Sequence, residues 1–204
     1  SGLPCPEPRF GRVTRSRLPK HCPWPYADDS EALVFATIAI ERAVQLTRMD
    51  SSFVTSRLAK WPELERAGVF DQLIANDDRT EGNVLLDARG KFWLIDHARS
   101  MGGGGQRLFS TDFAPSIRNF FLDQIRGESL PDRMKRKNTL IGACYEMVAS
   151  VRRVPYQELR VPEALAGQID SFLSRRAASL QAFVLDAVDL PDLYRDDDST
   201  RSAQ

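Results

Sequence analysis

Three oxygen-bearing side chains in the middle of the chain have the spacing that a phosphoryl-transfer site requires. Asp78 comes five residues before Asn83, and Asp96 comes thirteen residues after it. Carboxylate and amide oxygens are ligands that Mg²⁺ prefers. Phosphoryl transfer depends on positioning and charge neutralisation, so one carboxylate could face an attacking hydroxyl while the amide and the second carboxylate hold the metal. The spacing therefore predicts a magnesium-dependent site for this chemistry.

A β-hairpin is expected between these residues. The apolar runs 84–86 and 92–95 are separated by Asp87-Ala-Arg-Gly-Lys91, which has the Asp and Gly of a tight turn. Because an antiparallel pair brings its outer ends together, Asn83 and Asp96 should be neighbours. Asp, Asn and Gly also flank hairpins for turn reasons alone, so each position by itself is weak evidence. The joint spacing carries the prediction.

The elements before the hairpin should support it. We expect a strand over residues 32–40 and a short helix capped by Asp50 that ends near Trp61. A second helix should begin at Pro62 and run into the Asn76-Asp77-Asp78 loop. Its apolar residues recur at three- and four-residue steps, which predicts one buried stripe of Leu64, Ala67, Phe70, Leu73 and Ile74.

The second half of the chain reads as helical. We expect helices over about residues 115–127 and 132–150, and a long one that begins at Pro162-Glu163. The four glycines at 102–105 favour a flexible loop over a phosphate cradle, because no Gly-Lys-Ser/Thr follows them. The apolar periodicity assigns to the buried faces Met134, Leu140, Ile141, Cys144, Met147, Val148, Leu165, Ile169, Phe172, Leu173, Leu180, Phe183, Val184 and Val188.

Length and composition limit the class of protein. The 204 residues suit one domain, with 42% apolar content for a core and 28 basic against 28 acidic residues. Balanced charge gives no direct nucleic-acid signal, and no apolar run reaches the roughly 20 residues that cross a bilayer. We see no signal peptide. Three cysteines without metal-ligand spacing favour reduced thiols and a cytoplasmic location.

A family resemblance rests on the central motif. The run Phe70-Asp-Gln-Leu-Ile-Ala-Asn-Asp-Asp-Arg-Thr-Glu-Gly-Asn-Val-Leu-Leu-Asp87, followed by Gly90-Lys-Phe-Trp-Leu-Ile-Asp-His-Ala98, resembles the core pattern of the HipA-like kinases. The match is dense over about thirty residues. Weaker similarity extends to Gly2–Pro8, which resembles the segment after the N-lobe helix of that family, and to the run that begins at Leu33, which resembles its hinge strand.

The resemblance implies a fold and an activity. The fold would be α+β and mainly α: a protein-kinase-like C-lobe over residues 32–190, with an extended Pro-rich segment at 1–31 and a disordered tail at 191–204. The activity would be ATP- and Mg²⁺-dependent phosphorylation of a protein Ser/Thr hydroxyl. Asp78 would be the catalytic base, and Asn83 and Asp96 would bind the metal and cofactor. Residues 35–40 would lie along the adenine edge.

Departures from the family pattern leave an alternative open. Thr80 stands where the family has His, and Ala98 where it has Gly. The chain before Leu33 has no glycine-rich hairpin, and its only lysine, Lys20, is a poor phosphate ligand. The phosphate clamp would then come from a missing N-lobe in a longer chain, or from a partner. Without it, the chain would be a pseudokinase-like nucleotide-binding or protein-interaction module. The sequence does not identify the protein substrate.

Overall fold

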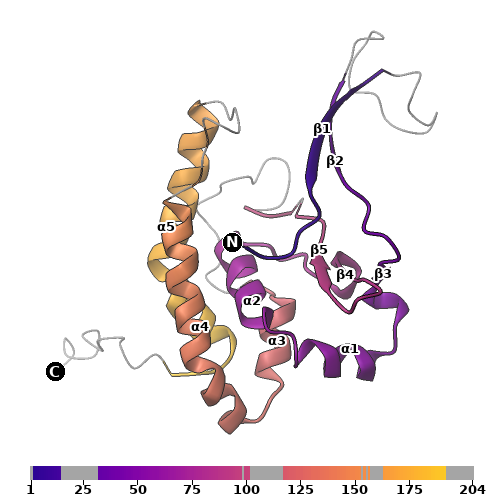
Figure 1. The fold of residues 1–204 in the computed structure, drawn as a ribbon. Helices are drawn as coiled ribbons and strands as arrows, with labels where there is room; N and C mark the ends of the chain where they lie inside the picture. Colours follow the sequence, from indigo (N-terminus) through magenta and orange to yellow (C-terminus); the bar gives the residue numbers. More distant parts are fainter. Residues whose placement is uncertain are drawn as a thin grey trace, which may run out of the picture.

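A computed structural model describes residues 2–14, 32–97, 99–101, 117–152, 154, 156 and 163–191 (Figure 1). This part of the chain is mainly helical, with five α-helices, two short 3-10 helices and a three-stranded antiparallel sheet beside a two-stranded ribbon. The elements in order are β1 (Pro8–Val13), β2 (Ala32–Thr37), β3 (Val44–Gln45), η2 (Leu46–Arg48), α1 (Ser51–Leu58), α2 (Leu64–Leu73), η3 (Glu81–Asn83), β4 (Val84–Leu86), β5 (Phe92–Leu94), α3 (Phe120–Arg126), α4 (Leu130–Val151) and α5 (Glu163–Ala187).

The predicted hairpin is confirmed as β4 and β5, which pair antiparallel with Val84 opposite Leu94. β3 extends the sheet on the β4 side, so the strand order is β3-β4-β5. Alternation places Val84 and Leu94 in the core, while Leu85 and Trp93 are half-buried on the other face. Asp87 closes the turn: one carboxylate oxygen accepts from two backbone N–H groups, and the other accepts from the Trp93 indole at 3.0 Å.

The strand predicted over residues 32–40 is shorter than expected. β2 ends at Thr37, and the following Ile38 is 43% exposed, so the apolar run does not stay buried to its end. The burial expected for residues 32–36 lies outside what the structure describes. β2 pairs with β1, a strand that the proline-rich composition did not predict. The two form a ribbon that rises away from the helices in Figure 1.

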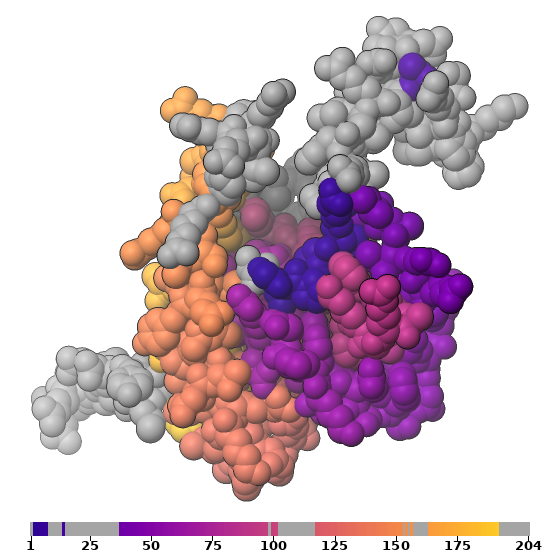
Figure 2. Space-filling view, in the orientation of Figure 1, coloured from indigo at the N-terminus to yellow at the C-terminus, as the bar shows by residue number. Residues whose placement is uncertain are grey.

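The N-terminal residues before β1 lie on the body of the molecule, as expected for an extended segment. Leu3 is buried in the core, and the Leu94 N–H of β5 donates to the carbonyl of Pro4 at 2.8 Å. Figure 2 shows this segment, in indigo, against the pink surface of the hairpin. The segment therefore covers the outer edge of β5.

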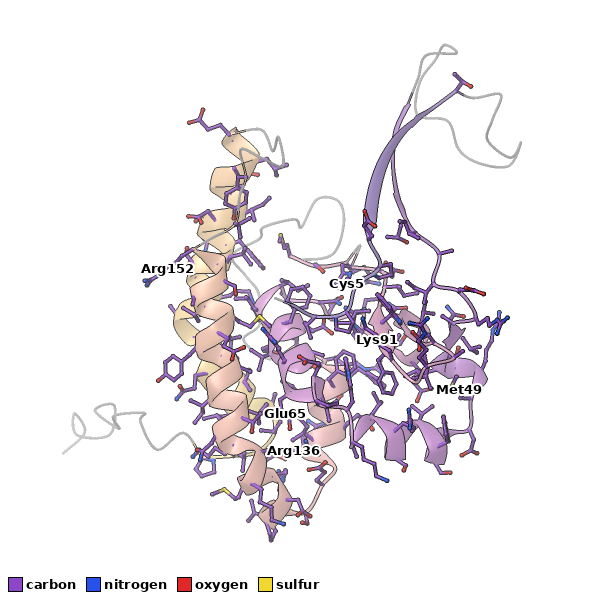
Figure 3. The ribbon with its side chains drawn as sticks, viewed as in Figure 1. Cys5, Met49, Glu65, Lys91, Arg136 and Arg152 are labelled. Carbon is purple, nitrogen blue, oxygen red and sulfur yellow. The ribbon has the colours of Figure 1, made fainter. Side chains whose placement is uncertain are left out.

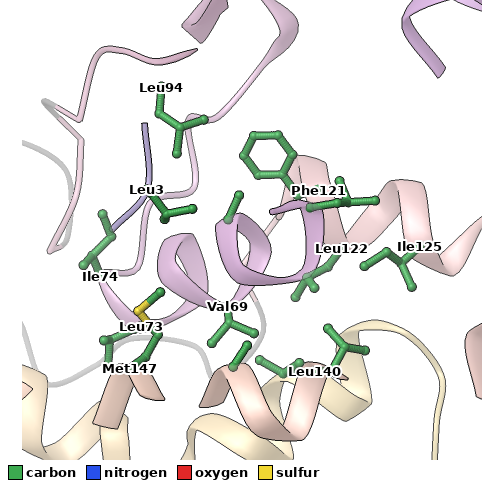
Figure 4. Packing of buried hydrophobic residues seen from close by; sticks show 14 of the residues in the cluster. Leu3, Val69, Leu73, Ile74, Leu94, Phe121, Leu122, Ile125, Leu140 and Met147 are labelled. Atoms are coloured by element: carbon green, nitrogen blue, oxygen red, sulfur yellow. The ribbon is translucent and has the colours of Figure 1, made fainter. Parts of the chain in front are cut away.

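Helix α2 is the centre of the fold. It contacts α3, α4 and α5, and Figure 4 shows core side chains on both sides of it, with Leu3 and Leu94 on one side and Leu140 and Met147 of α4 on the other. The predicted buried stripe is confirmed at Leu64, Ala67, Leu73 and Ile74, with Phe70 half-buried, but burial extends beyond it because α2 is covered on nearly every side. The helix begins at Leu64, two residues later than expected, after a turn at Pro62-Glu63.

The other helices begin at polar caps. The predicted Asp50 cap of α1 is confirmed: its carboxylate accepts from the Phe53 N–H at 3.0 Å. α1 ends at Leu58 and not at Trp61. Asn119 and Ser129 cap α3 and α4 in the same way, so α3 begins at Phe120 and α4 at Leu130.

Two residues assigned to the buried faces are exposed. Met134 is 45% exposed and Leu165 is 36% exposed. Each lies near the first turns of its helix, α4 or α5, where the helix extends past its neighbours in Figure 1. The apolar periodicity continues there although none of the described helices or strands covers it. The glycines at 102–105 and the tail at 192–204 lie outside the described residues. No helix in the described part of the chain is long and apolar enough to cross a membrane.

Candidate functional site

The end of the hairpin brings the predicted site residues together along the backbone. One pair beyond the last ladder pair, the Ile95 N–H donates to the carbonyl of Asn83 at 3.1 Å. Asp96 follows directly. The expectation that Asn83 and Asp96 are neighbours is therefore confirmed at the level of the main chain.

The side chain of Asn83 closes the loop that carries Asp78. Its Nδ2 donates to the backbone carbonyl of Asp78 at 3.0 Å. A carbonyl can only accept, so the amide nitrogen must be on this side, and Oδ1 is directed away from it. Gln45 of β3 holds the same loop, because its Nε2 donates to the carbonyl of Gly82 at 2.9 Å. The loop is thus held at Asp78, before η3, and at Gly82, in the middle of η3.

Asp96 has a left-handed backbone, with φ of 54°. This region is costly for residues with a Cβ, and Asp and Asn enter it more readily than most. The side chain is exposed at the end of β5. Residues held in such sparsely populated conformations cluster at functional sites, which makes Asp96 a candidate on grounds independent of the spacing.

Asp78 is partly exposed, and its carboxylate lies near a cation that sequence reasoning missed. Arg99 Nη1 is 3.7 Å from Asp78 Oδ1, with side-chain exposures of 59% and 43%. An ion pair this long and this exposed contributes little stability. The Asp78 carboxylate therefore stays accessible from solvent, and so does the neighbouring Asp77.

Beneath these residues lies a buried ion pair between Arg79 and Asp71 of α2, both with side chains 0% exposed. Arg79 Nε and Nη2 donate to the two Asp71 oxygens at 2.8 and 3.0 Å. Its Nη1 donates to the carbonyls of Asn83 and Ile95, at 3.2 and 2.5 Å. Sequence reasoning missed this arginine. The one available signal was a basic residue inside the acidic loop 77–81.

Asn76 is a third member of this cluster, again missed from the sequence. Its Nδ2 donates to Asp71 Oδ1 at 3.0 Å, and its backbone N–H donates to the Asp71 carbonyl at 2.9 Å. Ala75, between α2 and the loop, has φ of 50° and turns the chain back. The carboxylate of Asp71 therefore accepts three N–H bonds and fixes the exit from α2.

His97 packs behind the site. Its ring meets Phe70 edge-on at a centroid distance of 5.8 Å, and its Nε2 is buried with no hydrogen-bond partner among the described residues. Burial lowers the pKa of His97, and the charge of Arg79 lowers it further. The imidazole is therefore neutral at physiological pH. Thr80, which stands at the cap of η3, makes no side-chain capping bond. Ala98 lies outside the described residues.

Two predictions concern what the site binds: a Mg²⁺ ion, and the adenine of ATP along residues 35–40. Among the described residues, no group of three His, Cys, Asp or Glu side chains is placed to hold a metal ion. The expected metal ligands are one amide and one carboxylate, from Asn83 and Asp96, which suits Mg²⁺ held jointly with phosphate oxygens or water. Ala39 and Ile40, from the expected adenine edge, line a hollow of about 370 Å³ together with Arg42 and Trp93, among others. This hollow lies at the turn end of the hairpin, opposite to the end that carries Asn83 and Asp96.

No protein-family model matches this chain, and no curated protein matches it.

Proposed function

We propose that this chain is a HipA-like kinase domain that transfers a phosphoryl group from ATP, with Mg²⁺, to a Ser or Thr hydroxyl of a protein. The observation that carries the proposal is the antiparallel closure of the hairpin, in which Ile95 N–H donates to the Asn83 carbonyl. It links Asn83, at the end of the Asp78-x4-Asn83 loop, to the residue before Asp96, which supports the convergence that the chemistry requires. The proposed fold is a kinase-like C-lobe.

Each residue has a role that its geometry allows. The Asn83 Oδ1 is directed away from the Asp78 carbonyl, so it is available in position as a metal ligand. Asp96 would supply the second oxygen from its left-handed position. Bound Mg²⁺ would neutralise the phosphate charge. The exposed Asp78 carboxylate would accept the proton of the attacking hydroxyl, displacing the weak contact with Arg99.

A pseudokinase-like module is the second candidate, and Thr80 favours it. Thr80 stands where the resembled family has His, and its side chain makes no capping bond to η3. In the first candidate the phosphate clamp comes from an N-lobe or a partner outside these residues. In the second, the chain binds nucleotide or another protein without turnover.

Titration of ATP in the presence of Mg²⁺, measured by calorimetry, tests the shared prediction of nucleotide binding. The decisive variant is Asp96→Asn, because Asn accepts a left-handed φ and keeps the shape while removing the charge. We expect Asp96→Asn to lose the Mg²⁺-dependent part of binding. The matched control is Asp77→Asn, an exposed acid of the same loop, which should bind as the wild type does. Equal binding by all three proteins would refute metal ligation by Asp96.

Intact-mass measurement separates the two candidates. After incubation with ATP and Mg²⁺, alone and with a cell extract as the source of partner and substrate, an active kinase should add phosphoryl mass to itself or to a protein. Asp78→Asn should bind ATP and transfer nothing. Binding without transfer by the wild type, under both conditions, would support the pseudokinase-like module.

A further inference from the structure

We infer that Arg79, held by Asp71, is the positioning residue that sets the separation between Asn83 and Asp96 and so determines metal affinity. The inference rests on the proposed function, because it concerns the same pair of metal ligands. It adds a residue that does not itself touch the metal. Arg79 acts through the backbone on which each ligand stands.

The first step is the reach of the guanidinium. Arg79 Nη1 donates both to the carbonyl of Asn83 itself and to the carbonyl of Ile95, the residue whose C=O begins the peptide bond to Asp96. One nitrogen therefore joins the two peptides that carry the proposed ligands. The Ile95 N–H to Asn83 carbonyl bond completes a closed ring of contacts. Any movement of the Asn83 backbone relative to the Ile95 backbone breaks at least one of these bonds.

The second step is the anchor of the guanidinium. Arg79 is bidentate to Asp71, whose carboxylate also accepts from Asn76 Nδ2, so the pair cannot rotate. Asp71 lies in α2, which is covered by α3, α4 and α5. The backbone at Asn83 and at Ile95 is thereby attached to α2, the most buried helix in the described part of the chain. Four of the five guanidinium N–H donors are used, which a lysine ammonium cannot reproduce in this planar arrangement.

The third step is the cost of keeping this group. A buried ion pair gives little net stability against an apolar pair of the same volume. Apolar side chains would fill the space beneath the loop equally well, but they could not hold two carbonyls at fixed points. Residues behind metal ligands commonly change metal affinity by about 10–100-fold when replaced. Arg79 has the contacts expected of such a residue.

The test compares Arg79→Lys with Arg136→Lys. Arg136 is a matched control: it is a largely buried arginine that donates to the carboxylates of Glu65 and Glu128 and to the carbonyl of Ala59, away from the loop (Figure 3). Calorimetry gives the affinity for ATP with chelator and with Mg²⁺, and the ratio of the two is the metal-dependent gain. We expect Arg79→Lys to reduce this gain about tenfold and to change the metal-free affinity less than about twofold. Arg136→Lys should leave the gain unchanged.

A second measurement needs no nucleotide. Amide hydrogen exchange of Ile95, whose N–H donates to Asn83, should be about tenfold faster in Arg79→Lys. Exchange of the Asp87 amide, which donates to Lys91 at the turn end of the same hairpin, should not change. Unchanged exchange at Ile95 would overturn the positioning role.

The outcomes separate the two proposals. If the wild type shows no metal-dependent gain, the proposed function fails, and the exchange comparison still decides whether Arg79 positions the strand ends. If the gain exists and Arg79→Lys keeps it, or loses metal-free and metal-dependent affinity together, the inference fails alone. If Arg79→Lys does not fold, Asn76→Ala replaces it, because it loosens Asp71 by one bond. The expected change is then about two- to threefold in the same direction, and no change overturns the inference.

Discussion

The helices around α2 and the loop that follows α2 are held in place by different interactions. Between the helices the contacts are apolar, and Figure 4 shows Leu140 and Met147 of α4 facing Val69 and Leu73 of α2. On either side of the hairpin, in residues 74–83 and 95–97, the decisive contacts are hydrogen bonds to Arg79 and Asp71, with left-handed backbone at Ala75 and Asp96. Apolar contacts are not directional, whereas the hydrogen bonds of these segments fix individual peptides. The proposed chemistry lies in the second kind of region.

The largest effect on stability should come from breaking the buried pair. Asp71→Ala leaves the Arg79 charge unpaired in a site with no exposure, and we expect a loss of about 3–5 kcal/mol in the free energy of unfolding. Urea denaturation followed by circular dichroism measures it. The control Asp77→Ala removes an exposed acid of the same loop and should cost less than about 0.5 kcal/mol. A loss below about 1 kcal/mol for Asp71→Ala would show that the loop tolerates the loss of the buried Arg79–Asp71 ion pair.

A core substitution in the helical region should cost about as much or slightly less. Leu140 has no exposed surface, and Leu140→Ala should lower the free energy of unfolding by about 3 kcal/mol through lost burial and a cavity. The comparison is sharpened by exchange of the Ile95 amide under native conditions. Exchange of this amide through local opening should be no faster in Leu140→Ala than in the wild type. In Asp71→Ala it should be faster. Faster local opening at Ile95 in Leu140→Ala would mean that the two regions are one cooperative unit.

The sequence predicted features that depend on neighbouring residues better than features that depend on tertiary packing. The strands of the hairpin, the turn at Asp87 and the cap at Asp50 were predicted, because each depends on neighbouring residues. Met134 and Leu165 were placed wrongly, because periodicity shows which face is apolar and not where the partner helix ends.

The contacts of the candidate site show the same limit. The main-chain closure between Asn83 and Ile95 follows from strand pairing and could be predicted. The contacts of Arg79 could not, because its partners Asp71 and Ile95 lie eight and sixteen residues away and are reached only after the chain has folded. No periodic pattern encodes such contacts. The left-handed φ of Asp96 was equally hidden, since Asp is compatible with many conformations.

A smaller, pH-dependent effect belongs to the helical region. Burial raises the pKa of the Cys144 thiol to about 12, from an ordinary value of 9.0. The folded state therefore keeps a proton that the unfolded state loses, so stability is full below about pH 9 and falls above it. We expect the wild type to lose about 1 kcal/mol between about pH 9 and pH 10 relative to Cys144→Ala, measured by urea denaturation. Parallel pH profiles for the two proteins would contradict the burial of this thiol.

The smallest effect should be at the surface of the loop. Arg99→Ala removes the long, exposed contact with Asp78 and should change the free energy of unfolding by less than about 0.5 kcal/mol. The same denaturation experiment measures it, at low and at high salt. A change above about 1 kcal/mol would mean that the exposed Arg99–Asp78 contact stabilises the fold as the buried Arg79–Asp71 pair does, against our expectation.

The bond from Leu94 to the carbonyl of Pro4 has a consequence for how molecules of this protein meet one another. β5 is the last strand of its sheet, and an open strand edge invites pairing with another molecule. Here the chain covers its own edge, with Leu3 buried beneath as the attachment. A chain that begins at residue 8 would expose both the Leu94 N–H group and the part of the apolar core that Leu3 covers. It should aggregate at concentrations where the full chain does not, and light scattering of the two would show the difference.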